Sequence, residues 1–113
     1  MTLAYVLNRT SNTVSVIDTK THSVIATVLV GNTTLDLAFT PDGELAYVVN
    51  DFSRNVSVID TKTHAVIATI PVAPPGGAFF GFIKFTPDGK FAFVLISDFD
   101  GVVVIDTKTH NVI

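Results

Sequence analysis

The sequence repeats itself, and this repetition restricts the fold to an array of similar units. The heptapeptide Val-Ile-Asp-Thr-Lys-Thr-His occurs unchanged at residues 16–22, 58–64 and 104–110, at offsets of 42 and 46 residues. The tripeptide Ala-Tyr-Val at residues 4–6 recurs at the same two offsets, with phenylalanine replacing tyrosine in the third copy. Three copies of a seven-residue identity are not a chance event. The 113 residues therefore hold about two and a half copies of one structural unit.

The repeated unit is made of strands. Valine, isoleucine and threonine contribute 17, 9 and 15 residues, and these β-branched side chains fit a pleated sheet better than a helix. Turn signals such as Pro41-Asp42-Gly43 and Pro87-Asp88-Gly89 separate strand-sized segments, and no window has a helical period. A period in the low to mid forties built from strands indicates propeller blades rather than helical solenoids.

One repeat divides into four strands, which we name A to D, at residues 35–40, 45–50, 55–60 and 65–72. The whole chain then reads B-C-D, A-B-C-D and A-B-C, with residues 111–113 starting a last D strand. The predicted fold class is all-β: a partial β-propeller of antiparallel four-stranded blades, with ten strands and no helix longer than one turn. The predicted segments are a partial blade at 1–32, a complete blade at 33–73 and a partial blade at 78–113. Several runs are apolar on both faces, as expected for blades stacked between two neighbours.

The repeat resembles that of the YVTN-family β-propellers. Tyr-Val-Val-Asn at residues 47–50, the segment at 55–61 and Thr-Pro-Asp-Gly at 40–43 carry the resemblance, and Tyr-Val-Leu-Asn at 5–8 is a second copy of the name-giving motif. The third copy, at 93–96, has lost both the tyrosine and the asparagine. The resemblance implies a seven-bladed propeller with a periplasmic or extracellular, cell-surface location. No charged segment followed by an apolar one opens the sequence, so no signal peptide is expected in it.

Two turns recur and have conformational explanations. In Pro41-Asp42-Gly43 the proline presets φ and the glycine supplies a positive φ, which predicts a type I turn closed by a bulge. In the Asp-Thr-Lys-Thr-His turn, the aspartate accepts hydrogen bonds from backbone N–H groups, and the histidine occupies a left-handed position. We therefore expect His22, His64 and His110 to lie in exposed C–D loops. Equivalent positions diverge around a propeller rim, so these histidines are not expected to share a metal ion.

Composition excludes several functions. A net charge of −3 with 15% charged residues provides no basic surface, so no nucleic-acid partner is expected. Without cysteine there is no disulfide, thiolate metal site or cysteine nucleophile. The longest apolar run, at residues 91–96, is too short to cross a bilayer, so no membrane insertion is expected. We predict no catalytic residue, no metal and no cofactor.

The repeats differ at one end of each blade. The A–B and C–D turns share an end and are nearly invariant, whereas the B–C loops and D–A connections at the other end differ in every copy. Loops on a rigid scaffold commonly carry binding residues, although loops also vary when nothing constrains them. Residues 74–77 with the following aromatic pair are expected to form a protrusion on this variable end. The candidate binding residues are Arg9, Asp51, Phe52, Arg54, Phe79, Phe80, Asp98 and Asp100.

Three functions are compatible with these features. The prediction is a non-catalytic binding or scaffold module, with an unknown ligand or protein partner on the B–C/D–A loop end. The alternatives are part of a lactonase-like or quinoprotein-like propeller enzyme, and a purely structural cell-surface repeat. Because the strands do not divide into whole blades, we expect either a piece of a longer propeller or self-association through the end blades.

Overall fold

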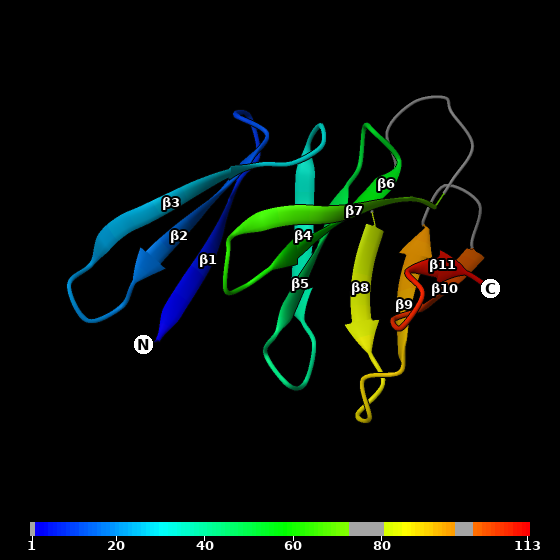
Figure 1. Ribbon diagram of the computed structural model, residues 1–113. Helices are drawn as coiled ribbons and strands as arrows, with labels where there is room; N and C mark the ends of the chain where they lie inside the picture. The colour runs from blue at the N-terminus through cyan, green and yellow to red at the C-terminus, as the bar shows by residue number, and fades with distance from the viewer. Residues whose placement is uncertain (1, 73–80, 97–100) are drawn as a thin grey trace.

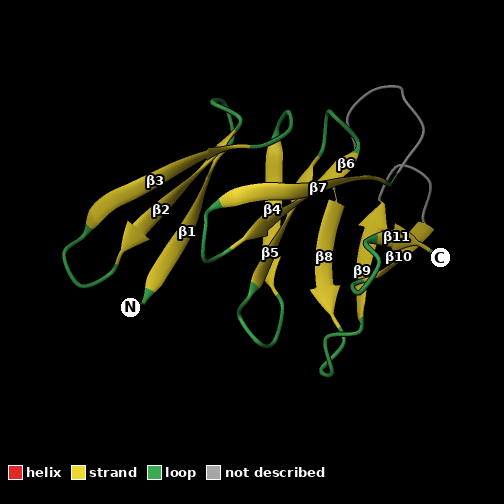
Figure 2. Cartoon of the chain, in the orientation of Figure 1, coloured by secondary structure: helices red, strands yellow, loops and turns green. Residues whose placement is uncertain are grey.

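The computed structural model describes residues 2–72, 81–96 and 101–113, and in these ranges the chain forms strands and turns without a helix (Figures 1 and 2). The strands are β1 (Leu3–Asn8), β2 (Thr13–Asp18), β3 (Ser23–Leu29), β4 (Thr34–Phe39), β5 (Leu45–Asn50), β6 (Asn55–Asp60), β7 (Ala65–Pro71), β8 (Gly81–Phe85), β9 (Phe91–Ile96), β10 (Gly101–Asp106) and β11 (Asn111–Val112).

The strands form three separate antiparallel sheets, which stand side by side in chain order (Figure 1). The first blade is β1-β2-β3, the second is β4-β5-β6-β7, and the third is β8-β9-β10-β11. The predicted all-β, propeller-type fold is confirmed. Residues 111–113 were expected to start a last D strand, and β11 forms there over two residues, so the described strands number eleven and not the predicted ten. The pairings of β2 with β3 and of β6 with β7 shift register at equivalent places, after Val16 and after Val58.

The burial of each strand follows from its place in the stack. In β5 and β6 of the second blade, consecutive residues are buried on both faces, because this blade has a neighbour on each side. In β9 of the third blade, buried and exposed residues alternate, because only one face meets another blade. Burial on both faces of β5 and β6 therefore reflects stacking. The same expectation fails for the apolar runs at 24–25 and 102–105, since Val24 is 58% exposed and Val102 is 56% exposed.

Two hydrophobic cores lie between the blades. The core between the first and second blades is formed by Tyr5, Val14, Val16, Val28, Ala46, Val48 and Ile59. The core between the second and third blades is formed by Tyr47, Val49, Val56, Val58, Ile70, Val72, Ile83, Ala92, Val94, Ile96 and Ile105. Within the described residues, apolar burial is thus concentrated at the contacts between sheets.

The repeated histidines do have the predicted left-handed backbone, with φ of 61° at His22, 58° at His64 and 59° at His110. The expectation that all three are exposed was wrong, since only His22 is exposed and the other two are half-buried. The cause is a hydrogen bond to the preceding blade. The hydroxyl of Tyr5 lies 2.8 Å from Nδ1 of His64, and that of Tyr47 lies 2.8 Å from Nδ1 of His110.

Candidate functional site

The turns at the invariant end of the blades are held by hydrogen bonds of their own aspartate and threonine side chains. In each Asp-Thr-Lys-Thr-His turn, the aspartate Oδ1 accepts the lysine N–H two residues later, as Asp60 does from Lys62 at 2.8 Å. The threonine hydroxyl of the same turn donates to the A–B turn beside it, as Thr61 does to the carbonyl oxygens of Gly43 and Glu44. The sequence identity of these turns therefore has a structural explanation.

The bulged turn is also as predicted. Gly43 and Gly89 both have φ of 75°, the left-handed conformation that the turn demands. The threonine before each proline donates its hydroxyl to the aspartate of the same turn, at 2.6 Å for Thr40 to Asp42. This bond and the backbone N–H of Glu44 lower the pKa of the Asp42 carboxyl.

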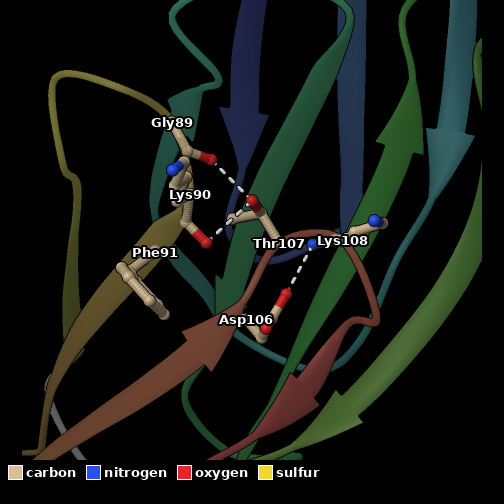
Figure 3. Close-up of a pocket in the computed structure, with 6 residues that line it drawn as sticks. All are labelled: Gly89, Lys90, Phe91, Asp106, Thr107 and Lys108. Carbon is tan, nitrogen blue, oxygen red and sulfur yellow. Dashed lines mark hydrogen bonds between the residues drawn. The ribbon is translucent and has the colours of Figure 1, made fainter.

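A hollow of about 250 Å³ lies against these turns in the third blade (Figure 3). It is lined by Gly89, Lys90, Phe91, Asp106, Thr107 and Lys108. Figure 3 shows its polar groups turned toward one another: the Thr107 hydroxyl bonds to the carbonyl oxygens of Gly89 and Lys90, and the Lys108 N–H bonds to Asp106. A second hollow of about 420 Å³ lies against the equivalent turn of the first blade, at Asp18 to Lys20. Since the hollow recurs at equivalent turns, where the threonine hydroxyl and the aspartate carboxylate are engaged in the turns themselves, it is a property of the repeat.

At the variable end, the B–C loops of the first two blades share a backbone conformation but carry different side chains. The B–C loops of the first two blades have the same length, and each ends in a left-handed residue, Asn12 with φ of 59° and Arg54 with φ of 57°. The carbonyl oxygens of these two residues accept the N–H of Val30 and of Val72, at 3.0 and 3.1 Å. The loop conformation is therefore kept while Arg-Thr-Ser-Asn in the first blade becomes Asp-Phe-Ser-Arg in the second.

The predicted site residues of these two loops occupy different depths. Arg9 is exposed and Phe52 is 58% exposed, so both are available for contact. Asp51 and Arg54 are buried, with exposed fractions of 1% and 6%. Burial raises the pKa of the Asp51 carboxyl to about 6, and the Gly81 N–H and the Arg9 charge lower it by smaller amounts. The structure thus brings together Arg9, Asp51, Phe52 and Arg54 at one end, two at the surface and two beneath it.

The other four candidate residues, Phe79, Phe80, Asp98 and Asp100, lie outside the described residues, as does the predicted protrusion at 74–77.

Two polar links at this end were missed by sequence reasoning. The Nδ2 of Asn50 donates to Ser57 Oγ at 2.9 Å, and Asn8 donates to Ser15 in the same way at 2.8 Å. A signal existed: the third copy replaces the asparagine by isoleucine and the serine by valine together. Residues of the D–A connection are also held, since the N–H groups of residues 32 and 33 donate to Ser53 Oγ and to Asn12 Oδ1. Nothing in the sequence marked this second link.

Among residues 2–72, 81–96 and 101–113, no three histidine, aspartate or glutamate side chains lie close enough to hold a metal ion. In the same part of the chain, no helix is long and apolar enough to cross a membrane.

The stacked antiparallel sheets of three or four strands and the recurring turns define a β-propeller-type repeat module, and solved structures show the same architecture. Hydrazine synthase from Kuenenia stuttgartiensis matches with a TM-score of 0.88 and 33% identity, over 98% of this chain and 31% of that chain. Dihydro-heme d1 dehydrogenase NirN in complex with DHE matches with a TM-score of 0.81 and 19% identity, over 98% of this chain and 23% of that chain. AztD from Citrobacter koseri matches with a TM-score of 0.78 and 12% identity, over 91% of this chain and 29% of that chain.

This chain therefore spans less than a third of each of these structures. No family model and no curated protein matches the sequence. The matches establish the propeller-type fold.

Proposed function

We propose that the chain is a non-catalytic binding or scaffold module of a β-propeller with YVTN-like repeats, and that the variable end holds a ligand or protein partner. The observation that carries the proposal is the pair of B–C loops, which share a backbone conformation and differ in side chains. Loops that vary for lack of constraint also drift in length and conformation. These two loops keep the left-handed conformation at the same position and the same closing hydrogen bond, so only the side chains change.

Within the described residues, hydrogen bonds link the loops of the first two blades at the variable end. The backbone N–H groups of Asp51 and Phe52 donate to the carbonyl oxygens of Thr33 and Asn32, at 2.8 and 3.2 Å. With the bonds to Ser53 and Asn12, these contacts tie the D–A connection to the B–C loops of two blades. A preorganised surface loses less conformational entropy on binding.

The exposed side chains at the variable end favour an aromatic anion as the ligand. Arg9 offers a guanidinium that pairs with carboxylates, and Phe52 offers an exposed ring. Asp51 is buried below the surface and accepts a hydrogen bond from the Gly81 N–H. We therefore assign it a structural role in the loop, without direct contact with the ligand.

The proposal is tested by titrating the isotope-labelled chain with phenylacetate and with neutral benzyl alcohol, followed by amide NMR. We expect phenylacetate to shift amides at 9–12, 31–34 and 51–54 more than benzyl alcohol does. The variants R9A and F52A should weaken this response. The control K62A changes an exposed lysine at the invariant end and should leave it intact. Shifts centred on residues 19–22 and 61–64, or a response unchanged in R9A and F52A, would contradict the proposal.

A second role is favoured by the 33% identity to the hydrazine synthase chain: the module would then be the propeller part of an enzyme. In that case residues of a larger assembly, rather than Arg9 and Phe52, would contact the ligand. The same R9A and F52A variants distinguish the two roles, because they would leave the binding of that enzyme's ligand unchanged.

A further inference from the structure

The two outer faces of the blade stack are not equivalent. We call the face of a blade toward its predecessor the leading face, and the opposite one the trailing face. In the second blade, the leading face includes Val48 and Ile59, both 0% exposed against the first blade. The equivalent positions on the leading face of the first blade are Val6, 43% exposed, and Ile17, half-buried. This apolar face has the composition of a blade contact without a blade beside it in this chain.

His22 adds a hydrogen-bonding side chain to the leading face of the first blade. Its φ of 61° matches those of His64 and His110, and its N–H closes the same turn by donating to the Asp18 carbonyl oxygen at 2.7 Å. At the two contacts within the chain, this histidine meets the tyrosine hydroxyl of the preceding blade at 2.8 Å. His22 is therefore preset for the same bond, and it is the exposed one of the three histidines.

We infer that the leading face of the first blade is an interaction surface for one further β-blade, and that His22 selects a blade carrying a tyrosine hydroxyl on its second strand. The argument rests on continuity: the contact occurs twice within this chain, with the same apolar positions and the same tyrosine–histidine pair. The occupant has defined chemistry, namely an apolar antiparallel sheet face with one phenolic donor.

The chain's own third blade does not fit this description. Its trailing face places Phe93, 41% exposed, where the second blade has Tyr47, and so lacks the hydroxyl. It also places the exposed Lys84 where the second blade has Ala38, which packs against the third blade. A charged residue facing outward from a sheet opposes the burial of that sheet. Head-to-tail association of identical copies would therefore leave His22 unbonded and Lys84 buried.

The experiment restores the missing features in the same chain. The variant F93Y/K84A carries both features of the second blade's trailing face, and sedimentation velocity measures its self-association against the unmodified chain. We expect F93Y/K84A to associate at least about 10-fold more tightly. The hydroxyl alone, compared as F93Y/K84A against K84A, should contribute about 3- to 10-fold, the range of one neutral hydrogen bond.

Two controls assign that gain to His22. In H22G, glycine keeps the left-handed turn without strain but removes the imidazole, so the gain from F93Y should vanish. F82Y adds the same hydroxyl to another exposed phenylalanine of the third blade and should give no gain. In a mixture of differently labelled F93Y/K84A copies, an intermolecular NOE should connect the new tyrosine ring with His22.

The inference is overturned if F93Y strengthens association equally in the H22G background, which would indicate pairing of two third blades. It is equally overturned if F82Y gives the same gain, or if F93Y/K84A remains monomeric at every concentration while folded by circular dichroism.

Discussion

Replacing Tyr47 by phenylalanine isolates the hydrogen bond between the second and third blades. Tyr47 is 0% exposed, and its ring also makes an edge contact with Phe85, with centroids 5.0 Å apart. The variant Y47F keeps that ring in place and removes only the hydroxyl that lies 2.8 Å from Nδ1 of His110. The effect on unfolding therefore reports the Tyr–His bond with little change in packing.

The expected loss of stability in Y47F depends on how well the His110 ring is hydrated once the tyrosine hydroxyl is gone. His110 is half-buried, so its ring nitrogen regains part of its hydration, and the cost should be about 1 kcal/mol, near the mean for one hydrogen bond. For a domain of about 100 residues this corresponds to a fall in Tm of about 4–8 °C. Y5F removes the equivalent bond at the other contact and should cost a similar amount.

Urea unfolding followed by circular dichroism measures these differences, with H110G used to complete a double-mutant cycle. Glycine accepts the left-handed φ of position 110, so the loop is not strained. We expect a coupling of about 1 kcal/mol between Tyr47 and His110. A Y47F variant as stable as the unmodified chain, or a coupling near zero, would refute the role assigned to this pair.

Three further predictions follow from the pKa shifts and from the third blade. Burial and the charge of Asp106 raise the pKa of Tyr47 to about 12, so the folded chain keeps a proton that the unfolded chain releases near pH 10. Stability should therefore fall by up to about 2 kcal/mol between pH 10 and 12, and Y47F should remove this fall in a series of urea titrations. Because the pKa of Asp51 is raised to about 6, its ionisation opposes folding as pH rises from 3.8 to 6; D51N should raise Tm at pH 7.5, with the gain shrinking below pH 4. N50I and S57V should each destabilise the chain by about 1–3 kcal/mol, whereas the double variant, which reproduces the third blade's apolar pair, should cost less than their sum; additive losses in calorimetry would contradict the pairing.

The strands could be predicted closely because the chain supplies three aligned copies of its own turns. The turn signals predict strand C at 55–60 and strand D at 65–72, and the observed strands are Asn55–Asp60 and Ala65–Pro71. The left-handed histidines followed from the same turn analysis. Periodicity thus determines the conformation within a repeat.

The contacts between repeats could not be predicted in this way. Tyr5 and His64 are 59 residues apart, and repetition alone does not say which position of one blade meets which position of the next. The burial of Asp51 was also hidden, since the equivalent residue Arg9 is exposed. The same loop position has different surroundings in different blades, because only the second blade has neighbours on both sides.

That position of the second blade makes the stack a one-dimensional cooperative system. Removing an end blade breaks one interface, whereas opening the middle blade breaks two, so fluctuations should begin at the ends and spread inward. The amides of β5 and β6 then belong to the last unit to exchange with solvent, although all three sheets are antiparallel and built from the same repeat. Stability in this chain is therefore a property of position in the array, and a blade becomes resistant to opening when it gains a neighbour, without any change in its own sequence.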